Sequence, residues 1–435
     1  MKRFGAKIIF QFFILSAFFC LFSCSNHKLN SKKEKLISQR ELRTHQNGRD
    51  ILEYIKDVEA QKNQAVDDFI AQLDLDQKVA QLFVVNLVGC DTFSPVETII
   101  AGGFLYFGYN IAQTPVAMAQ FNQSIIDYCK QNNKIPPFLT VDQEGGFVNR
   151  LRSLNGPLPS AQRITQNLDV SKAAELYTLQ AKQMKALGFT MNLAPVAEVC
   201  TPDNEVFLNE RSFGNLDQVK QYGTECVLAY EENGVGTVLK HFPGNTNTDP
   251  HTGLPQISWS DAELKMQMDA FRALVAKNPS AVLMSHARVK GYDEKNPACL
   301  SEYWVTQMLR NELGFTGIIF SDDIFMGALA DNGYPPELAV VAAIQAGIDC
   351  IMISEKRIGS SVEVLCKKAK ADNLFAKRID NAVRRIIEYK MKCGFLEVQL
   401  GSDGKYTLVI NYPEISGQGF DQAREKNIEL YTENF

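Results

Sequence analysis

The chain has 435 residues, of which 45% are hydrophobic and 22% are charged, and its formal net charge is −5. This amino-acid composition is that of an ordinary globular protein, and it excludes fibrous, disordered and multi-span membrane proteins. Because the body of the chain has no basic cluster, we expect no nucleic-acid partner. Ten cysteines without CxxC pairs or Cys/His ligand spacing predict isolated thiols and no metal site.

The N-terminus has the layout of a bacterial lipoprotein signal. Basic residues at positions 2, 3 and 7 precede an apolar run at 8–22, which at about 15 residues is short for a membrane span of about 20. The pattern predicts a signal peptide at 1–23, lipid attachment at Cys24 and a polar tether at 24–60. We therefore expect an exported, membrane-anchored bacterial protein, in the periplasm or at the cell surface. Ordinary secretion, with Cys20 and Cys24 incidental, is the alternative.

From about Leu73 onward, short apolar runs alternate with longer amphipathic stretches. Several runs are continuously apolar, as in strands that are buried on both faces. Eight such runs are present: Val79–Val88, Gly102–Phe107, Phe138–Val141, Phe189–Pro195, Gly236–Phe242, Ala281–Val289, Gly317–Phe320 and Gly347–Ile353.

The intervening stretches, for example Ala161–Leu187 and Leu216–Asn233, are long and periodic enough for helices. Eight strands alternating with helices predict an α/β fold, a (β/α)8 TIM-type barrel in a single catalytic domain over residues 61–395. An open doubly wound sheet is the structural alternative, although no glycine-rich phosphate loop follows a strand. Residues 396–435 form a C-terminal extension that is too short for a further sizeable domain.

Charged and imidazole side chains gather where five consecutive predicted strands end. In a barrel of this kind the active site lies at the carboxyl ends of the strands. The side chains at those ends are Asp142, Glu144, Glu198, Lys240, His241, His286, Asp322 and Asp323. Cleavage of a glycosidic bond needs a carboxylate to trap an oxocarbenium-like centre and an acid for the departing oxygen, so the set suits that chemistry. Such a reaction requires no cofactor, and we expect none.

At these residues the sequence resembles glycoside hydrolase family 3, in its single-domain β-N-acetylglucosaminidase (β-N-acetylhexosaminidase) branch. The resemblance covers roughly residues 65–395. Six segments carry it: VDQEGGFVNRLR (141–152), NLAPVAEV (192–199), ERSFG (210–214), KHFPG (240–244), DPHTGLP (249–255) and SDDIFMGAL (321–329).

The resemblance implies roles for individual residues. Asp322 matches the nucleophile that forms a glycosyl-enzyme, and His251, oriented by Asp249, matches the acid/base of this branch. An Asp–His pair supports a protonated imidazole near neutral pH. Because the reaction would pass through a glycosyl-enzyme, the resemblance also implies retention of the anomeric configuration. The residues that match positions holding the terminal sugar's hydroxyls are Asp142, Arg150, Arg211, Lys240 and His241.

Four other rim residues carry weaker expectations. Asp323 is expected to cap the strand end rather than to act in catalysis, and Glu144 either pairs with a basic neighbour or touches sugar. Glu198 stands where the family usually has Asp, and His286 is expected to form part of the wall of the site.

The loop after KHFPG departs from the family pattern. It lacks the usual His-Gly-Asp, is about two residues shorter, and has Pro250 between Asp249 and His251, where a proline limits backbone freedom. Phe147 replaces an Arg that is common in the GGR segment. These departures bear on His251 more than on Asp322.

The sequence thus favours an exo-acting β-N-acetylglucosaminidase, expected to be monomeric, that works on peptidoglycan fragments or related amino sugars. A family 3 β-glucosidase is one alternative, but such enzymes more often have Trp after the nucleophile and an acid from a further domain. A surface lipoprotein that binds sugar without cleaving it is the other alternative. The sequence also leaves open whether water or phosphate ends the cycle.

Overall fold

The computed structural model describes residues 48–249, 253–325 and 327–435. The predicted signal peptide with Cys24, and the proposed acid/base His251, lie outside the described residues. The chain divides into two compact units, one with the residues up to Phe69 and Leu396–Val409, the other with Ile70–Phe395 and Ile410–Phe435. None of the helices in the described part of the chain is long and apolar enough to cross a membrane.

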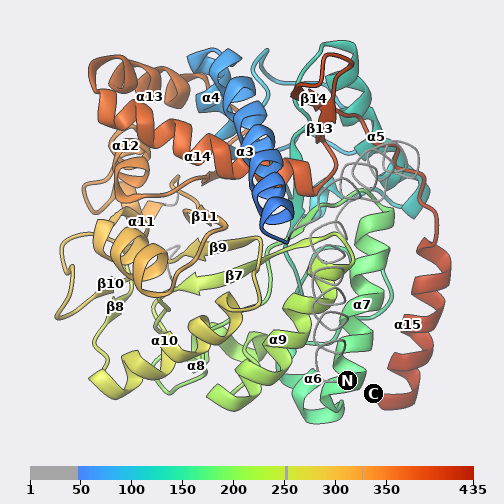
Figure 1. The fold of residues 1–435 in the computed structure, drawn as a ribbon. Coiled ribbons are helices and arrows are strands. Elements are labelled where there is room, and N and C mark those ends of the chain that lie inside the picture. The colour runs from blue at the N-terminus through green and yellow to red at the C-terminus, as the bar shows by residue number, and fades with distance from the viewer. Residues whose placement is uncertain (1–47, 250–252, 326) are drawn as a thin grey trace, which may run out of the picture. The chain divides into compact units, whose positions relative to one another are not determined.

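The larger unit contains an eight-stranded parallel sheet (Figure 1). Consecutive strands from β1 to β11 pair with each other, and β1 pairs with β12. A parallel bridge between Phe320 of β11 and Cys350, just before β12, completes the circle. The predicted (β/α)8 barrel is therefore confirmed. Its strands are β1 (Phe83–Asn86), β2 (Gly103–Tyr106), β3 (Phe138–Val141), β6 (Met191–Asn192), β7 (Gly236–Phe242), β9 (Ala281–Met284), β11 (Ile318–Phe320) and β12 (Ile351–Ile353).

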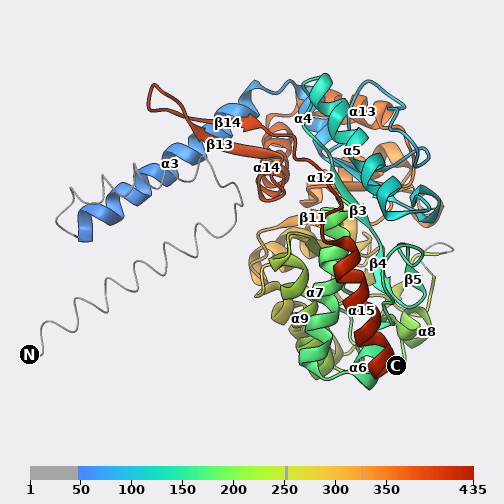
Figure 2. The same ribbon diagram turned by 90° about the vertical axis from the view of Figure 1, so that its right-hand side faces the viewer.

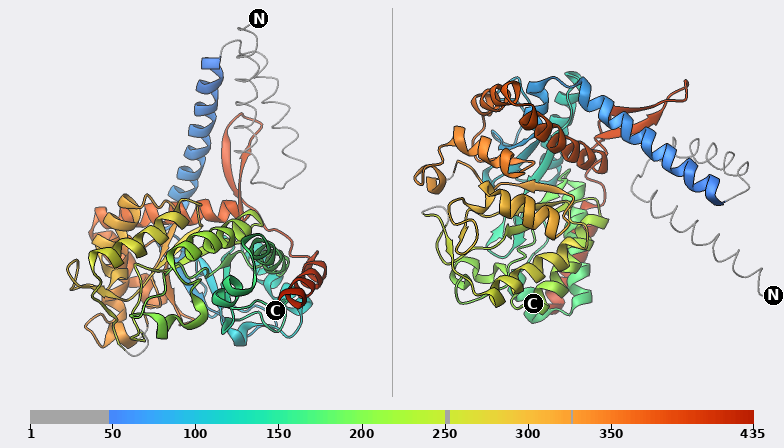
Figure 3. Two further views of the ribbon diagram at one scale, coloured as in Figure 1. Left: turned by 90° about the horizontal axis from the view of Figure 1, so that it is seen from below. Right: turned by 60° about the vertical axis from the view of Figure 1, so that its left-hand side comes forward.

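Helices surround these strands (Figure 3). Residues 87–102 join β1 to β2 without a helix. The main helices are α4 (Leu75–Gln81), α5 (Pro115–Gln131), α6 (Ala161–Asn167), α7 (Val170–Ala186), α9 (Leu216–Glu232), α10 (Asp261–Val275), the π-helix η4 (Tyr303–Glu312), α12 (Pro336–Ala346), α13 (Gly359–Ala371) and α14 (Asn373–Lys392). Short elements at the loops are η1 (Gly108–Asn110), α8 (Glu205–Leu208), η2 (Asn209–Arg211), η3 (Ala298–Leu300), α11 (Gly327–Ala330), β4 (Gln143–Gly145), β5 (Val148–Asn149), β8 (Gln256–Ile257) and β10 (Arg288–Val289).

Side-chain caps set two helix boundaries that the apolar pattern alone does not indicate. The run assigned to the first strand begins in helix α4, whose N-cap Asp74 accepts a hydrogen bond from the Gln77 N–H, while the Gln77 side chain returns to the Asp74 N–H. The stretch Ala161–Leu187 is helical as expected, and it divides into α6 and α7 because Asp169 caps the start of α7.

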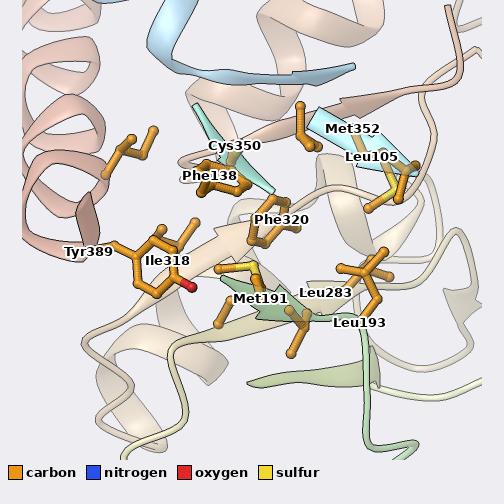
Figure 4. Close-up of a cluster of buried hydrophobic side chains, with 14 residues drawn as sticks. Leu105, Phe138, Met191, Leu193, Leu283, Ile318, Phe320, Cys350, Met352 and Tyr389 are labelled. Carbon is orange, nitrogen blue, oxygen red and sulfur yellow. The ribbon is translucent and has the colours of Figure 1, made fainter. Parts of the chain in front are cut away.

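The interior of the barrel is filled by side chains from alternate positions of the strands (Figure 4). The Phe138 ring meets the ring of Phe320 edge-on at 6.0 Å and the ring of Tyr389 at 5.8 Å. Tyr389 comes from α14, and its hydroxyl donates to the Thr190 carbonyl (2.6 Å), so its polar end is satisfied inside the core. The barrel is therefore a packed core, and its chemistry is confined to the rim.

The C-terminal helix α15 (Phe420–Asn434) lies alongside α7 (Figure 2). Its Asn427 is fully buried and accepts hydrogen bonds from Gln180 (2.6 Å) and Gln183 (3.0 Å) of α7. Asn427 also donates to the Pro157 carbonyl (3.0 Å). Part of the extension thereby supports the segment that follows the β4–β5 hairpin.

The smaller unit combines most of α3 (Gly48–Gln72) with the two-stranded sheet of β13 (Leu396–Leu400) and β14 (Tyr406–Ile410). The ammonium of Lys62 lies 5.3 Å from the centre of the Tyr406 ring. Residues 48–60, within the predicted polar tether, are helical. The bounds of the predicted regions otherwise stay predictions.

Lys390 allows the energetic cost of burying an amine in the core to be tested. Its amine is fully buried and donates to the Gln81 side chain (2.6 Å), and burial lowers its pKa to about 7. Because the unfolded lysine, with a pKa of about 10.4, holds its proton between pH 7 and 10.4, the stability of the wild-type protein rises with pH across that window. We expect Lys390→Met to be more stable than the wild type at pH 6.5, where the buried amine is largely charged, and to lose this advantage by pH 10, where the amine is neutral, a change on the order of 4 kcal/mol.

Urea unfolding at the two pH values measures this difference, with Lys377→Met, an exposed lysine of the same helix, as the control. A Lys390→Met variant that is less stable than the wild type at both pH values would contradict the interpretation.

Candidate active site

The predicted site residues lie where the barrel strands end. Asp142 follows β3, Lys240 and His241 lie near the end of β7, and Asp322 follows β11 by two residues. Because all eight strands are parallel, these ends form one rim. The rim predicted from the sequence is therefore present as a single surface of the barrel.

A network of four charges is centred on Lys240. Its buried ammonium lies 2.7 Å from Asp142 Oδ1 and 2.6 Å from Glu144 Oε1. Glu144 also accepts two hydrogen bonds from the Arg211 guanidinium (2.8 and 2.9 Å). Burial alone would raise the pKa of Glu144, but Lys240 and Arg211 outweigh it and lower this pKa to about 2. Glu144 therefore pairs with basic neighbours, one of the two roles expected for it.

Glu144 is positioned by the β4–β5 hairpin, whose tight turn requires glycine twice (Figure 2). Gly145 has φ +101°, and a Cβ there would lie 2.2 Å from the Pro159 carbonyl oxygen. Gly146 has φ +54°, and its Cβ would lie 2.6 Å from the side chain of Ser160. At the tip, Phe147 is 83% exposed, so a large apolar ring stands in solvent beside the rim.

Glu198 is fully buried and organises the start of the loop after β7. Its carboxylate lies 2.7 Å from His241 Nδ1 and accepts the Asn245 N–H (2.7 Å). The His241 N–H also donates to it (3.2 Å). This carboxylate therefore sets the orientation of the His241 ring and ties the ring to the loop that carries Asp249.

Two arginines were also predicted to belong to the site. Arg211 lies over the Phe207 ring, with the guanidinium carbon 5.5 Å from its centre, and the same ring lies 6.1 Å from that of His241. The Arg150 N–H donates to the Asp142 carbonyl (3.3 Å). Arg150 Nε is buried without a hydrogen-bond partner among the described residues. A buried donor of this kind is available to a ligand that carries a hydrogen-bond acceptor.

The Asp322 carboxylate accepts the Asp323 N–H (2.8 Å). Burial would raise the pKa of Asp322, but nearby charges, that of Lys240 among them, and the hydrogen bond from the Asp323 N–H reverse the shift and bring this pKa below its usual value. Asp322 is therefore ionised at neutral pH, as a nucleophile requires. Asp323 differs, because burial raises its pKa, and its Oδ1 accepts the Phe325 N–H (3.0 Å) in the capping arrangement expected for it.

The loop that begins at Asn245 is anchored up to residue 247. Asn247 accepts from the Val206 N–H (2.8 Å) and donates to the Pro202 carbonyl (2.9 Å), which ties it to the loop before α8. Asp249 is exposed, and its carbonyl accepts the Gly253 N–H (3.2 Å). Since His251 is outside the described residues, the Asp249–His251 pair stays a prediction.

Within the described ranges, no group of three or more His, Cys, Asp and Glu side chains is placed to hold a metal ion. The acidic side chains of the rim instead pair with Lys, Arg or His side chains or with main-chain N–H groups. Lys240 contacts Asp142 and Glu144, and Glu144 contacts Arg211, so the predicted residues Asp142, Lys240 and Arg211 belong to one network. His241 and Lys240 act electrostatically on Asp322. The contribution of Phe207 had no signal in the sequence, because this residue lies in the four-residue helix α8, which is too short to show an apolar pattern.

A (β/α)8 barrel whose rim holds an ionised Asp among paired carboxylates and cations is typical of glycoside hydrolases. Residues 74–389 match the N-terminal domain of glycosyl hydrolase family 3, and the chain belongs to this family. It is therefore a glycoside hydrolase.

Several relatives bear names that describe activity on amino sugars. The beta-hexosaminidase LpqI of Mycobacterium tuberculosis is 29% identical over 330 residues, which cover 74% of this chain and 84% of LpqI. A family 3 beta-N-acetylglucosaminidase from Paenibacillus sp. has a similar structure, with a TM-score of 0.71 and 29% identity over 82% of this chain and 69% of that one. A beta-N-acetylhexosaminidase from Beutenbergia cavernae has a TM-score of 0.65 and 27% identity, covering 74% of this chain and 99% of its own.

Glu144→Gln tests the charge network. The substitution leaves the buried Lys240 with one carboxylate partner, so we expect the protein to lose about 3–5 kcal/mol of stability at pH 7. The pKa of Glu144 in the folded protein, about 2, is below its usual 4.5, so its contribution is complete above pH 4.5 and disappears as the pH falls through about 2. The difference between wild type and variant should therefore shrink below pH 4.5.

Urea unfolding between pH 3 and 7 follows this difference, with the exposed Glu210→Gln as the matched control. An equal effect of the two substitutions, or a difference independent of pH, would show that the network does not stabilise the fold.

Proposed function

We propose that the protein is a retaining exo-β-N-acetylglucosaminidase that removes terminal β-linked N-acetylglucosamine through a covalent glycosyl-Asp322 intermediate. The ionised Asp322 carboxylate, placed by the end of β11 beside the cations of the rim, is the observation that carries the proposal. The names of the relatives support the choice of sugar.

In the first step, an oxygen of Asp322 attacks the anomeric carbon and the glycosidic oxygen departs. Lys240 and the arginines bind the hydroxyls of the terminal sugar and hold its anomeric carbon in line with the carboxylate. The unsatisfied Arg150 Nε and the polar ends of Asp142 and His241 are suited to the same task.

His251 gives its proton to the departing oxygen and then takes one from the attacking water. The carboxylate of Asp249 supports the imidazolium form, which sets an acid near neutral pH. Two displacements at the anomeric carbon leave its configuration unchanged. For His251 to reach the glycosidic oxygen, the loop that carries it is expected to move. Because Asn245 and Asn247 are anchored, this movement would begin after residue 247.

We expect Asp322→Asn to lower kcat for nitrophenyl β-N-acetylglucosaminide by at least about 10³-fold, because the amide cannot form the glycosyl ester. His251→Ala should lose less on this substrate, since nitrophenolate departs with little protonation, and more on a chitobiose-like disaccharide. Release of nitrophenol and of free sugar measures the two reactions. The exposed Asp217→Asn on α9 is the carboxylate control.

The same assay separates the alternatives. Turnover of nitrophenyl β-glucoside alone would indicate a β-glucosidase, and intact sugar binding without turnover of either glycoside would indicate a binding protein. Full activity of His251→Ala on the disaccharide would remove its acid/base role. A sugar phosphate formed in phosphate buffer would identify a phosphorylase.

We further propose that the protein is exported and anchored by a lipid at Cys24, where it acts on peptidoglycan fragments. The apolar run at 8–22 followed by Cys24 supports this proposal. Cys24→Ser should move the protein from the membrane to the soluble fraction, and Cys20→Ser should not. Equal membrane association of both variants would contradict the anchor.

A further inference from the structure

A buried thiol lies against the imidazole of His286, next to the turn that carries Asp322. His286 follows β9 by two residues, Cys299 lies in η3, and both are fully buried. Cys299 Sγ is 3.1 Å from His286 Nδ1, and His286 Nε2 is 3.0 Å from the main-chain carbonyl oxygen of Asp323. The Cys299 N–H also donates to the Ser285 carbonyl (3.1 Å), so the two segments are held in register.

These two contacts assign the proton on the imidazole. A carbonyl oxygen can only accept, so the Asp323 carbonyl favours a hydrogen on His286 Nε2, and a donor that faces Nδ1 adds to this preference. In the neutral ring Nδ1 then has a lone pair, and the Cys299 S–H is the donor that faces it. Burial, followed by the charge of Asp322, raises the pKa of Cys299 well above its usual value, so the thiol keeps its proton.

The imidazole in turn fixes Asp323, which takes part in three hydrogen bonds. The Asp323 carbonyl accepts from His286, its N–H donates to the Asp322 carboxylate (2.8 Å), and its own carboxylate accepts from the Phe325 N–H (3.0 Å). The position of the Asp322 oxygen therefore depends on the orientation of the Asp323 backbone. Loss of the His286 bond would free one end of that residue.

We propose that Cys299 is a positioning residue: its thiol proton holds His286 as the Nε2–H tautomer, and this tautomer fixes the turn from which Asp322 projects. The kinetic part of this proposal rests on Asp322 being the nucleophile. The assignment of the tautomer does not, because it concerns the protein without substrate.

The tautomer can be observed directly. The chain has five histidines, so long-range ¹H–¹⁵N spectra of histidine-labelled protein are simple, and His286→Gln assigns the signal of interest. We expect an unprotonated Nδ1 and a protonated Nε2 in the wild type, a mixture of tautomers in Cys299→Ala, and the wild-type pattern again in Cys299→Ser, which keeps a hydroxyl donor. An imidazolium or an Nδ1–H tautomer in the wild type would overturn the assignment.

Kinetics test the positioning role. Cys299→Ala should lower kcat on the order of tenfold, the equivalent of one lost hydrogen bond, with KM changed less than about twofold, and Cys299→Ser should restore most of the rate. Cys226→Ala, a buried free thiol of α9, controls for the loss of a core sulfur. Equal losses in the Ala and Ser variants, or no loss in Cys299→Ala, would overturn the role. A wild type that does not turn over either glycoside would instead refute the proposed function, while the spectra still test the tautomer.

Discussion

The ammonium of Lys240 is buried at the carboxyl end of a barrel strand, and a buried charge must be paired to be tolerated. Asp142 and Glu144 neutralise it from the segment after β3, and Arg211 balances the second carboxylate from the loop after β6. One electrostatic requirement thereby fixes the relative positions of three segments that are far apart in the sequence. It also holds the hydrogen-bonding groups of the rim in a rigid frame, which a sugar with several hydroxyls requires.

The rim uses buried carboxylates in two different ways. Asp322 is kept ionised by nearby cations, so that it can react. Glu198 is wholly buried and hydrogen-bonded to His241 and Asn245, so that it positions other groups. The same division applies to the imidazoles, since His241 is predicted to bind the sugar whereas His286 supports the backbone behind Asp322. Side chains whose buried polar groups are paired therefore hold the site together. Those with an unpaired polar group are available to bind a ligand.

The barrel and the location of its rim could be predicted from the sequence, because buried parallel strands are continuously apolar and their polar residues follow at one end. The strand at Phe138–Val141 agrees residue for residue, whereas the first strand was placed too early because the capping side chains of Asp74 and Gln77 continue a helix through Val79–Gln81. The pairing of Cys299 with His286 could not be predicted, since it depends on a contact between two loops. The roles of individual residues came from the resemblance to family 3, and those of His251 and Asp322 stay predictions until they are measured.

The central claim is that Asp322 becomes covalently bonded to the sugar. A fluorinated N-acetylglucosaminyl donor with a good leaving group forms such an intermediate faster than water removes it, so the intermediate accumulates. Mass spectrometry of the intact protein, followed by fragmentation of the labelled peptide, locates the bond. Our account predicts one sugar per chain, attached to Asp322 and absent from Asp322→Asn. Attachment to another residue, or full turnover of the donor without any adduct, would contradict it.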